Sequence, residues 1–231
     1  ILFDVDGRLF ASQASIFEAI KGAFDAIGYP LPDKPQILSI VGISLTQAFE
    51  ILIPWTDQAL NEKACNSYKS SFAHAGFHQE KPALYDGMMD LITSLRDIPD
   101  TYLGVATGKS RCGWDALLTG YDIKDWIITQ QVADNHPSKP HPSMILSAME
   151  ELGVSADQTV MIGDTSFDME KADVADVFSI GVEWGYRGRA RLHQANVMVS
   201  DTAVLLSTLE NGWRDKLWLN GHKNGFGRWL W

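Results

Sequence analysis

The chain has 231 residues, of which 45% are apolar, so it is long enough to bury a sizeable core and to hold one domain with an insertion. Its 19 basic and 29 acidic residues give a formal net charge of -10, which argues against broad binding of nucleic acids or anionic membranes. It shows neither an apolar run of transmembrane length nor a cationic leader, so a cytoplasmic location without a signal peptide is the default expectation.

The first predicted element is a short strand that ends in two acids. The apolar residues 1–3 are followed by Asp4, Val5, Asp6 and Gly7. Residues i and i+2 of an extended chain point to the same side, so both acids can face one pocket, and Gly7 allows a sharp turn. One carboxylate could attack phosphorus while the other carries the proton to and from the leaving oxygen. Taken alone, the motif is equally typical of a turn that ends a strand.

A long stretch with helical patterning follows, from about residue 15 to residue 82. Ile16, Ile20 and Phe24 belong to one apolar helix face, and another helix is expected at residues 57–71. The intervening segment 42–46, Gly-Ile-Ser-Leu-Thr, is either a specificity loop over the site or merely a connection between helices.

The next two motifs offer groups that bind phosphate. The strand at residues 102–106 ends in Thr107 and Gly108, which supply a hydroxyl and backbone amides where a helix begins. Lys139 lies in the proline-containing loop 138–142, ahead of an amphipathic helix. Singly, Thr107 would be an ordinary helix N-cap and Lys139 a solvated charge, so their assignment depends on the joint placement of all the motifs at successive strand ends.

Two further acids follow a later strand. The strand at residues 159–162 continues into Gly163 and Asp164, with Asp168 four residues farther on. Hard oxygen ligands favour Mg²⁺, so this strand end is a candidate metal site. The alternative for Asp164 is a simple turn residue, and for Asp168 an acid that complements a helix dipole.

The order of the elements indicates the fold class. Predicted strands alternate with helical segments and lie at residues 1–3, 102–106, 126–129, 159–162, 178–182 and 197–199. This order predicts an α/β fold, a Rossmann-like and mostly parallel sheet with helices on both faces. Beyond residue 211, Trp213, Trp218, Trp229 and Trp231 are expected to pack back on the core, with an oligomer contact as the alternative.

Together these four ordered motifs resemble those of the haloacid dehalogenase superfamily of aspartate-nucleophile phosphatases. The segments 105–111, 139–142 and 163–169 look especially like its phosphoglycolate-phosphatase-like branch, and the resemblance covers residues 1 to about 209. It implies that Asp4 is the nucleophile and Asp6 the general acid and base. Thr107 and the Gly108 amide would bind the transferring phosphoryl group, and Lys139 would balance its charge.

The resemblance also implies a metal and a domain division. Mg²⁺ would be held by the Asp4 carboxylate, the Asp6 backbone carbonyl and Asp164, while Asp168 would support the metal or orient Lys139. A core domain of residues 1–14 and 83–211 would carry an inserted small helical cap domain of residues 15–82 and a Trp-rich tail of residues 212–231. The cap would close over the site, exclude water and select the leaving group.

Three cations near these motifs need separate expectations. Arg8 stands where the family usually has Thr or Val after its Asp-x-Asp-Gly motif. It could bind a substrate carboxylate or phosphate, obstruct the pocket, or point away and pair with an acid elsewhere, and we favour the outward orientation. Lys109 and Arg111 are expected to be exposed charges at a helix start.

The histidines and cysteines near the motifs are assigned no chemistry. His136 and His141 are expected to be loop residues rather than metal ligands, because no Cys or His cluster accompanies them. Cys65 and Cys112 fall on separate predicted helices and are expected to be reduced packing residues.

The leading hypothesis is a magnesium-dependent phosphatase, a phosphoric monoester hydrolase that acts on a small phosphorylated metabolite through an aspartyl phosphate. The resemblance suggests phosphoglycolate. A phosphomutase would use the same intermediate, but the positions after Asp6 lack the His that such mutases of this family usually carry in the first cap helix. A dehalogenase would need neither Asp6 nor Asp164. Arg8 and the Trp-rich tail suggest an alternative of another class, a catalytically silent binding protein.

Overall fold

A single parallel sheet forms the centre of the protein. The computed structural model describes residues 1–54, 57–78, 82–185 and 194–215, with side chains for the same residues except 73–78 and 212–215. In that part of the chain, six parallel strands pair in the order β3-β2-β1-β4-β5-β6. They are β1 (Leu2–Phe3), β2 (Leu103–Ala106), β3 (Ile127–Gln131), β4 (Val160–Gly163), β5 (Phe178–Val182) and β6 (Val197–Val199). The α/β class predicted from the sequence is confirmed.

The strand order reverses beside β1. The chain builds outward from β1 through β2 to β3 and then returns to place β4 on the other side of β1. In the register, Leu2 lies opposite Gly104 of β2 and Met161 of β4. In open α/β sheets, ligand sites form at the carboxyl ends of the strands where the order reverses. The loops after β1 and β4 therefore occupy the position expected of a site.

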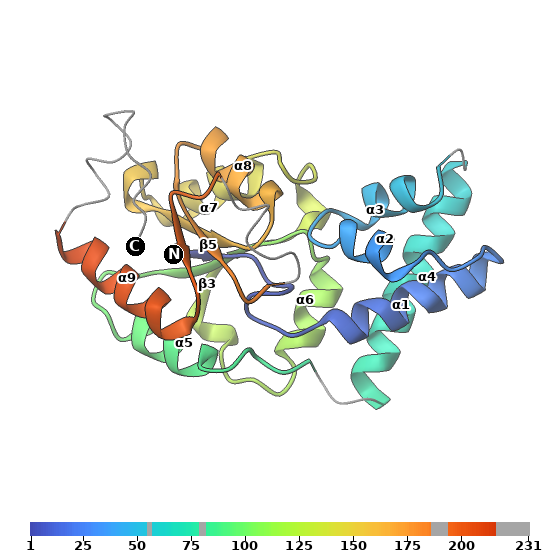
Figure 1. Cartoon of the computed structure of the whole chain (residues 1–231), viewed down its shortest axis with the longest axis horizontal. Helices are drawn as coiled ribbons and strands as arrows, with labels where there is room; N and C mark the ends of the chain where they lie inside the picture. The colour runs from blue at the N-terminus through green and yellow to red at the C-terminus, as the bar shows by residue number, and fades with distance from the viewer. Residues whose placement is uncertain (55–56, 79–81, 186–193, 216–231) are drawn as a thin grey trace.

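Helices cover both faces of the sheet. Figure 1 shows α7 (Ser143–Leu152) and α8 (Ser166–Val174) on one face, with α5 (Met88–Arg96) and α9 (Thr202–Asp215) on the other. β1, β2 and β4 are buried on both faces, which explains their continuous apolar sequences. Short 3₁₀ turns lie at Lys124–Trp126, Ala133–Asn135 and Ala156–Gln158.

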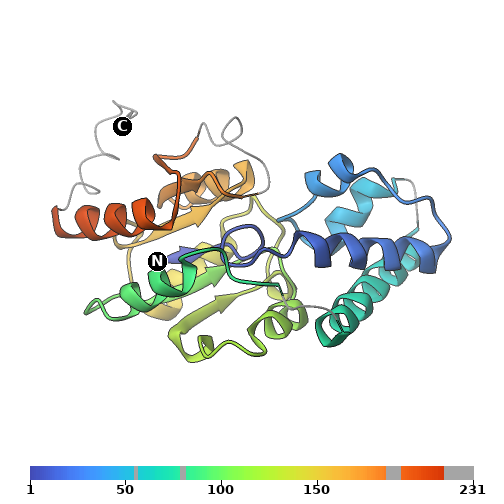
Figure 2. The same ribbon diagram turned by 60° about the horizontal axis from the view of Figure 1, so that its bottom comes forward.

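A second group of helices lies beside the core, between β1 and β2 in sequence (Figure 2). It comprises α1 (Gln13–Ile27), α2 (Lys34–Ser39), α3 (Leu45–Leu52) and α4 (Gln58–His78). α1 buries Ile16, Ile20 and Phe24, ends at Gly28 in the left-handed conformation, and packs along α4. We call these four helices and the segments that join them the cap, because their place in the chain matches the predicted cap domain. The domain boundaries at residues 15 and 82 stay a prediction.

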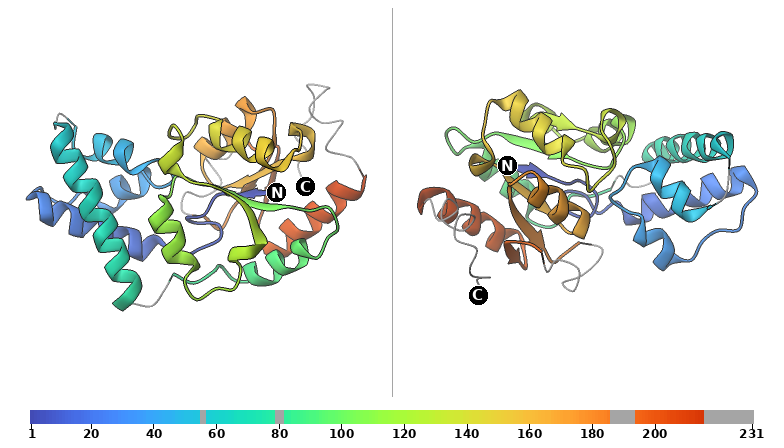
Figure 3. Two further views of the ribbon diagram at one scale, coloured as in Figure 1. Left: turned by 180° about the vertical axis from the view of Figure 1, so that it is seen from behind. Right: turned by 90° about the horizontal axis from the view of Figure 1, so that it is seen from above.

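The cap contacts the core directly. α4 packs against α6 (Arg111–Leu118), which stands on the side of the core that faces the cap (Figure 3, left). The backbone N–H of Ser44 donates a 2.9 Å hydrogen bond to Ser138 Oγ, in the loop that carries the predicted site lysine. A Cβ at Gly108 would clash with the carbonyl of Gly42. The segment 42–46 thus lies against the core loops, as a specificity loop would require.

Some expectations differ from the structure in detail. β3 begins one residue later than predicted because Lys124–Trp126 forms a 3₁₀ turn, and α4 continues seven residues beyond the predicted end of its helix. Cys65 is buried as expected, whereas Cys112 is exposed, so the packing role predicted for Cys112 was wrong. The side chains of all four tail tryptophans lie outside the described residues. Within the described chain, no helix combines the length and apolarity needed to cross a membrane.

Candidate active site

The first acid of the site extends the central strand. The backbone N–H of Asp4 donates a 3.0 Å hydrogen bond to the carbonyl of Ile162, which continues the pairing of β1 with β4. Asp164 follows β4 directly, and both acids are buried. The reversal of strand order therefore brings together two carboxylates that are far apart in sequence.

A tight turn after Asp4 directs the next side chains. Gly7 has a φ of 87°, a left-handed conformation that favours glycine. The N–H groups of Arg8, Leu9 and Phe10 all point to the Val5 carbonyl, at 3.3, 3.1 and 3.2 Å. The turn folds the chain back so that Arg8 lies beside Asp4.

Arg8 is completely buried among the acids of the site. Its Nη1 lies 2.7 Å from Asp4 Oδ2 and donates a hydrogen bond to the Asp6 backbone carbonyl. Its Nη2 pairs with Asp164 and lies 2.7 Å from Asp168 Oδ2. The outward orientation that we favoured from the sequence was wrong, because the Gly7 turn and the ion pairs with Asp4, Asp164 and Asp168 hold the guanidinium inside.

Two cations share one oxygen of Asp4. Asp4 Oδ2 lies 2.7 Å from both Arg8 Nη1 and Lys139 Nζ. Burial alone would raise the pKa of Asp4, but the charges of Arg8 and Lys139 outweigh it and hold that pKa below its usual value. Asp4 is therefore a carboxylate at neutral pH, as a nucleophile must be.

Asp168 lies in the first turn of α8 and also anchors the cations of the site. It forms a capping box with Thr165, whose Oγ1 donates a 2.7 Å hydrogen bond to Asp168 Oδ2. The other oxygen, Oδ1, accepts a 2.8 Å hydrogen bond from Lys139 Nζ and lies 3.2 Å from Lys171 Nζ. Burial would raise the pKa of Asp168, yet Lys139, Arg8 and Lys171 lower it well below its ordinary value.

Lys171 is a buried cation at the back of this cluster. Its ammonium donates a 2.6 Å hydrogen bond to the Ala106 carbonyl at the end of β2. Burial, together with the neighbouring charge of Lys139, lowers the pKa of Lys171 to about 7, although Asp168 and Asp4 oppose the shift. Lys171 thus titrates near neutrality inside the protein.

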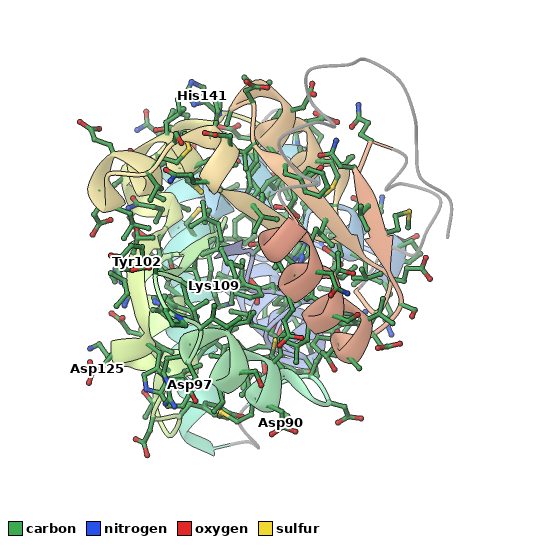
Figure 4. The ribbon with its side chains drawn as sticks, turned by 90° about the vertical axis from the view of Figure 1, so that its left-hand side faces the viewer. Asp90, Asp97, Tyr102, Lys109, Asp125 and His141 are labelled. Carbon is green, nitrogen blue, oxygen red and sulfur yellow. The ribbon has the colours of Figure 1, made fainter. Side chains whose placement is uncertain are left out.

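A separate ion pair holds Asp6 on the cap side of the cluster. Lys109 Nζ donates to Asp6 Oδ1 at 2.9 Å and to Oδ2 at 3.1 Å, and Ser12 Oγ also donates to Oδ1. Figure 4 shows Lys109 inside the outline of the molecule, with His141 and Asp125 at its edge. The expectation that Lys109 is exposed was wrong, because the cap covers it and Phe72 places its ring 4.2 Å below the ammonium.

The predicted phosphate-binding residues lie at the same edge of the sheet. Thr107 is buried and its Oγ1 accepts a 3.2 Å hydrogen bond from the Lys109 N–H, so the loop turns tightly around this hydroxyl. Gly108 is packed beneath the cap carbonyls. Arg111 lies outside the cluster, half-exposed, and bonds to Gln130. The structure thus gathers the predicted site residues, while the roles given to them stay predictions.

The two histidines lie outside the site. The ring nitrogens of His136 are each 2.9 Å from a neighbour, Ser143 Oγ and Gln131 Oε1, and burial lowers the pKa of His136. His141 is an exposed loop residue. Among the described residues, no group of three or more His, Cys, Asp or Glu side chains is arranged to hold a metal ion.

Sequence reasoning left three site cations unassigned or misplaced. They are Arg8, Lys109 and Lys171. Two of them stand at helical or turn spacing from a predicted acid, Arg8 at i+4 from Asp4 and Lys171 at i+3 from Asp168. That spacing was a usable signal, because an acid buried in a site needs a cation nearby.

The residues expected to hold Mg²⁺ lie together just beyond the carboxyl ends of β1 and β4. The Asp4 carboxylate, the Asp6 carbonyl and Asp164 offer the oxygen ligands that this ion prefers. The Arg8 guanidinium, however, contacts all three. With Arg8 in this position, the group of ligands does not fit a metal ion.

A pocket extends from the cluster into the cap. Asp6, Gly108 and Lys109 line its core side. Its cap side is mainly apolar and is lined by Ile16, Ile20, Ile43, Tyr68 and Phe72, among others. The polar end of this pocket can hold an anion, and the remainder has room only for a small group against apolar walls.

Comparison with known proteins agrees with the architecture and the motifs. Residues 1–182 match the family model described as haloacid dehalogenase-like hydrolase. A probable phosphatase, IndB of Dickeya dadantii, is 32% identical over 203 residues, covering 86% of this chain and 87% of that protein. The phosphoglycolate phosphatase of Photobacterium profundum is 27% identical, covering 80% and 83%.

A solved structure of a similar protein has the same fold. The crystal structure of a predicted phosphatase from Clostridium acetobutylicum superposes with a TM-score of 0.80 at 26% identity, covering 91% of this chain and 97% of that one. The matched family model spans most of the sequence and includes all four motifs. The chain therefore belongs to the haloacid dehalogenase-like hydrolase family, and its similarity lies with the phosphatases of that family.

Proposed function

We propose that the protein hydrolyses a small phosphomonoester through an aspartyl phosphate formed on Asp4. The observation that carries this proposal is the unequal environment of the two Asp4 oxygens. Oδ2 lies 2.7 Å from both Arg8 and Lys139. In the described part of the chain, the buried Oδ1 has no hydrogen-bond partner, and the ion pairs of Asp4 with Arg8 and Lys139 are both made through Oδ2. One oxygen is thus fixed, and the other keeps its lone pairs for attack on phosphorus.

In the first step, Asp4 Oδ1 attacks phosphorus and the bond from phosphorus to the leaving oxygen breaks. Asp6 is a carboxylate paired with Lys109 in the free protein, and it would take up a proton as the anionic substrate binds and then give that proton to the leaving oxygen. In the second step, water attacks phosphorus, the bond from phosphorus to Asp4 breaks, and the Asp6 carboxylate accepts the proton of the water. The products are an alcohol and inorganic phosphate, and both acids return to their starting states.

The remaining site residues would position the phosphoryl group. Thr107 and the Gly108 amide lie at the carboxyl end of β2, and Lys139 approaches from the loop before α7. Catalysis of phosphoryl transfer consists mostly of positioning and of neutralising oxygen charge. Asp168 would hold Lys139 in place through its 2.8 Å hydrogen bond.

Phosphatases of this family generally use a divalent metal ion. If Arg8 left the oxygens of Asp4, Asp6 and Asp164, they would suit Mg²⁺. The ion would then stabilise charge on the phosphoryl oxygens. Because Arg8 contacts all three ligands, the steps above are assigned to residues of the chain alone.

The pocket suggests the size of the substrate. Its cap wall is mainly apolar, and Lys69 and Lys109 are the cations that line it. A small ester such as phosphoglycolate could place its anionic group beside these lysines. One relative is named as a phosphoglycolate phosphatase. We propose phosphoglycolate and similar small phosphomonoesters as the first candidates.

The test is phosphate release from a panel of phosphomonoesters, with the wild type, Asp4→Asn and Asp97→Asn as a surface control. Asp97 is exposed directly after α5 and lies outside the site. Asp4→Asn is expected to lose roughly 10⁴-fold or more in kcat because the nucleophile is gone. Rapid quenching with labelled substrate should trap phosphate on the wild type and not on this variant. Full turnover by folded Asp4→Asn would refute the mechanism, and an isomerised phosphoester as product would favour the mutase.

A further inference from the structure

The side chain of Arg8 lies where several oxygen ligands converge. Its guanidinium bonds to Asp4, to the Asp6 carbonyl, to Asp164 and to Asp168, and the whole residue is 0% exposed. Three of these four partners are the oxygens that a divalent ion would use. A guanidinium and a metal ion cannot occupy the same position, both for lack of space and because like charges repel at this distance.

We propose that Arg8 replaces the divalent cation of this site, so that the folded protein keeps a guanidinium there and excludes Mg²⁺. The inference rests on the proposed function, since it assigns the charge-neutralising element of that same site. The planar guanidinium presents five N–H donors and stays charged at every pH of interest. It can therefore neutralise the nucleophile and the neighbouring acids permanently.

When Lys171 carries its proton, the charges of the site are balanced. In the described residues, its ion pairs join four carboxylates, Asp4, Asp6, Asp164 and Asp168, to four cations, Arg8, Lys109, Lys139 and Lys171. A divalent ion added to the free protein would leave two uncompensated positive charges in a buried region, which is costly. Without Arg8, one carboxylate would lack a cation and the same oxygens would attract a metal ion.

The backbone also holds Arg8 in place. Its N–H bonds to the Val5 carbonyl at 3.3 Å, and its carbonyl accepts a 3.4 Å hydrogen bond from Trp184 Nε1. The charges of Asp4 and Asp168 overcome the effect of burial and raise the pKa of Arg8. Moving the side chain out would break its ion pairs with Asp4, Asp164 and Asp168 and remove one positive charge from a buried cluster, so the inward position should dominate in solution.

The direct measurement is Mn²⁺ binding, followed by the loss of the electron paramagnetic resonance signal of the free ion. The proteins are wild type, Arg8→Thr, Arg96→Thr, and Arg8→Thr with Asp164→Asn. Arg96 lies on the surface of α5 and pairs with Asp97, so its variant removes the same charge away from the site. This control matters because a net charge of -10 attracts cations weakly everywhere.

Arg8→Thr should bind one Mn²⁺, and the added Asp164→Asn should abolish that binding. Wild type and Arg96→Thr should bind Mn²⁺ at least about 100-fold more weakly than Arg8→Thr. A 100-fold difference corresponds to a population of about 1% for molecules in which Arg8 has left the site. Mg²⁺ should raise the Tm of Arg8→Thr and leave that of the wild type unchanged. If wild type binds Mn²⁺ as tightly as Arg8→Thr, the proposal is overturned, and this wild-type measurement decides even when the variant fails to fold.

Phosphate release with chelator separates this inference from the proposed function. Release by wild type that survives chelation supports both. Release that requires Mg²⁺, with Mn²⁺ bound by wild type, overturns the replacement by Arg8 and leaves the phosphatase intact. Absence of release under every condition, with Mn²⁺ bound only by Arg8→Thr, supports the replacement and overturns the phosphatase.

Discussion

Lys109 Nζ lies 2.9 Å from Asp6 Oδ1, so the residue proposed as acid and base is held by a cation from the next loop of the core. The same ammonium lies over the ring of Phe72 in the cap. A cation–π contact of this kind strengthens when water is excluded. The position of the cap and the orientation of Asp6 are therefore linked through one side chain.

Replacement of Lys109 by Met should lower kcat/KM by roughly 100-fold, since Asp6 loses the donor that orients its carboxylate for proton transfer. Arg111→Met is the matched control, because Arg111 lies two residues away, is half-exposed and bonds outside the site. Steady-state phosphate release measures both. Equal kcat/KM values for the two variants would show that Lys109 does not position Asp6.

Replacement of Asp168 by Asn should lower the free energy of unfolding by about 3–5 kcal/mol, because Arg8, Lys139 and Lys171 would lose a shared buried partner. Asp173→Asn, on an exposed position of the same helix, should stay within about 0.5 kcal/mol of the wild type. Urea unfolding of the three proteins gives the comparison. A similar small loss for both variants would mean that the cations find other partners.

The stability of the protein should depend on pH through Lys171. Its pKa is about 7 in the folded protein and 10.5 ordinarily, so between these values the unfolded chain binds a proton that the folded chain has released. The free energy of unfolding contributed by this group therefore rises as the pH increases from about 7 to about 10.5, and it is constant below pH 7. Burial is the main cause of this lowered pKa and the charge of Lys139 adds to it, whereas Asp168 and Asp4 oppose it.

Lys171→Met tests this dependence when urea unfolding is measured at several pH values from 6 to 10. The free energy of unfolding of wild type, relative to that of Lys171→Met, should increase with pH above 7. Parallel curves for the two proteins would show that Lys171 keeps its ordinary pKa after folding.

Replacement of Gly108 by Ala should displace the cap, because the new Cβ would meet the carbonyls of Gly42 and Ile43. Both are backbone atoms, so they cannot rotate away as a side chain can. We expect kcat/KM to fall roughly 10- to 100-fold, because the displaced cap would misplace the substrate, and the Tm to fall, because a side chain forced against packed backbone is destabilising. Unchanged kinetics would mean that the cap adjusts at no cost to the reaction.

The sequence was sufficient to predict the sheet and the acids, for a simple physical reason. Parallel strands end at a common edge, so Asp4 after one strand and Asp164 after another had to meet once the strand order was known. Their positions follow from hydrophobic patterning and from the turn residues that end each strand, and both are local properties of the chain.

The orientations of the Arg8 and Lys109 side chains, in contrast, do not follow from the residues next to them in sequence. Whether Arg8 turned inward depended on the left-handed conformation of Gly7 and on acids 156 and 160 residues away. Lys109 followed a strand end and preceded a helix, which usually means exposure, but a cap residue distant in sequence covers it. Such contacts form only in the complete fold, so sequence patterns could not indicate them.

The pairing of Arg8 with Asp168, across 160 residues, also bears on how the protein is made. During synthesis, β1 and Arg8 are translated long before Asp164 and Asp168, the two acids that complete the surroundings of the guanidinium. Contacts of such large sequence separation form slowly because the intervening chain must first be ordered. The central strand is thus translated before the other strands of the sheet and is among the last parts completed, and a nascent chain that stops before α8 would hold Arg8 without Asp168.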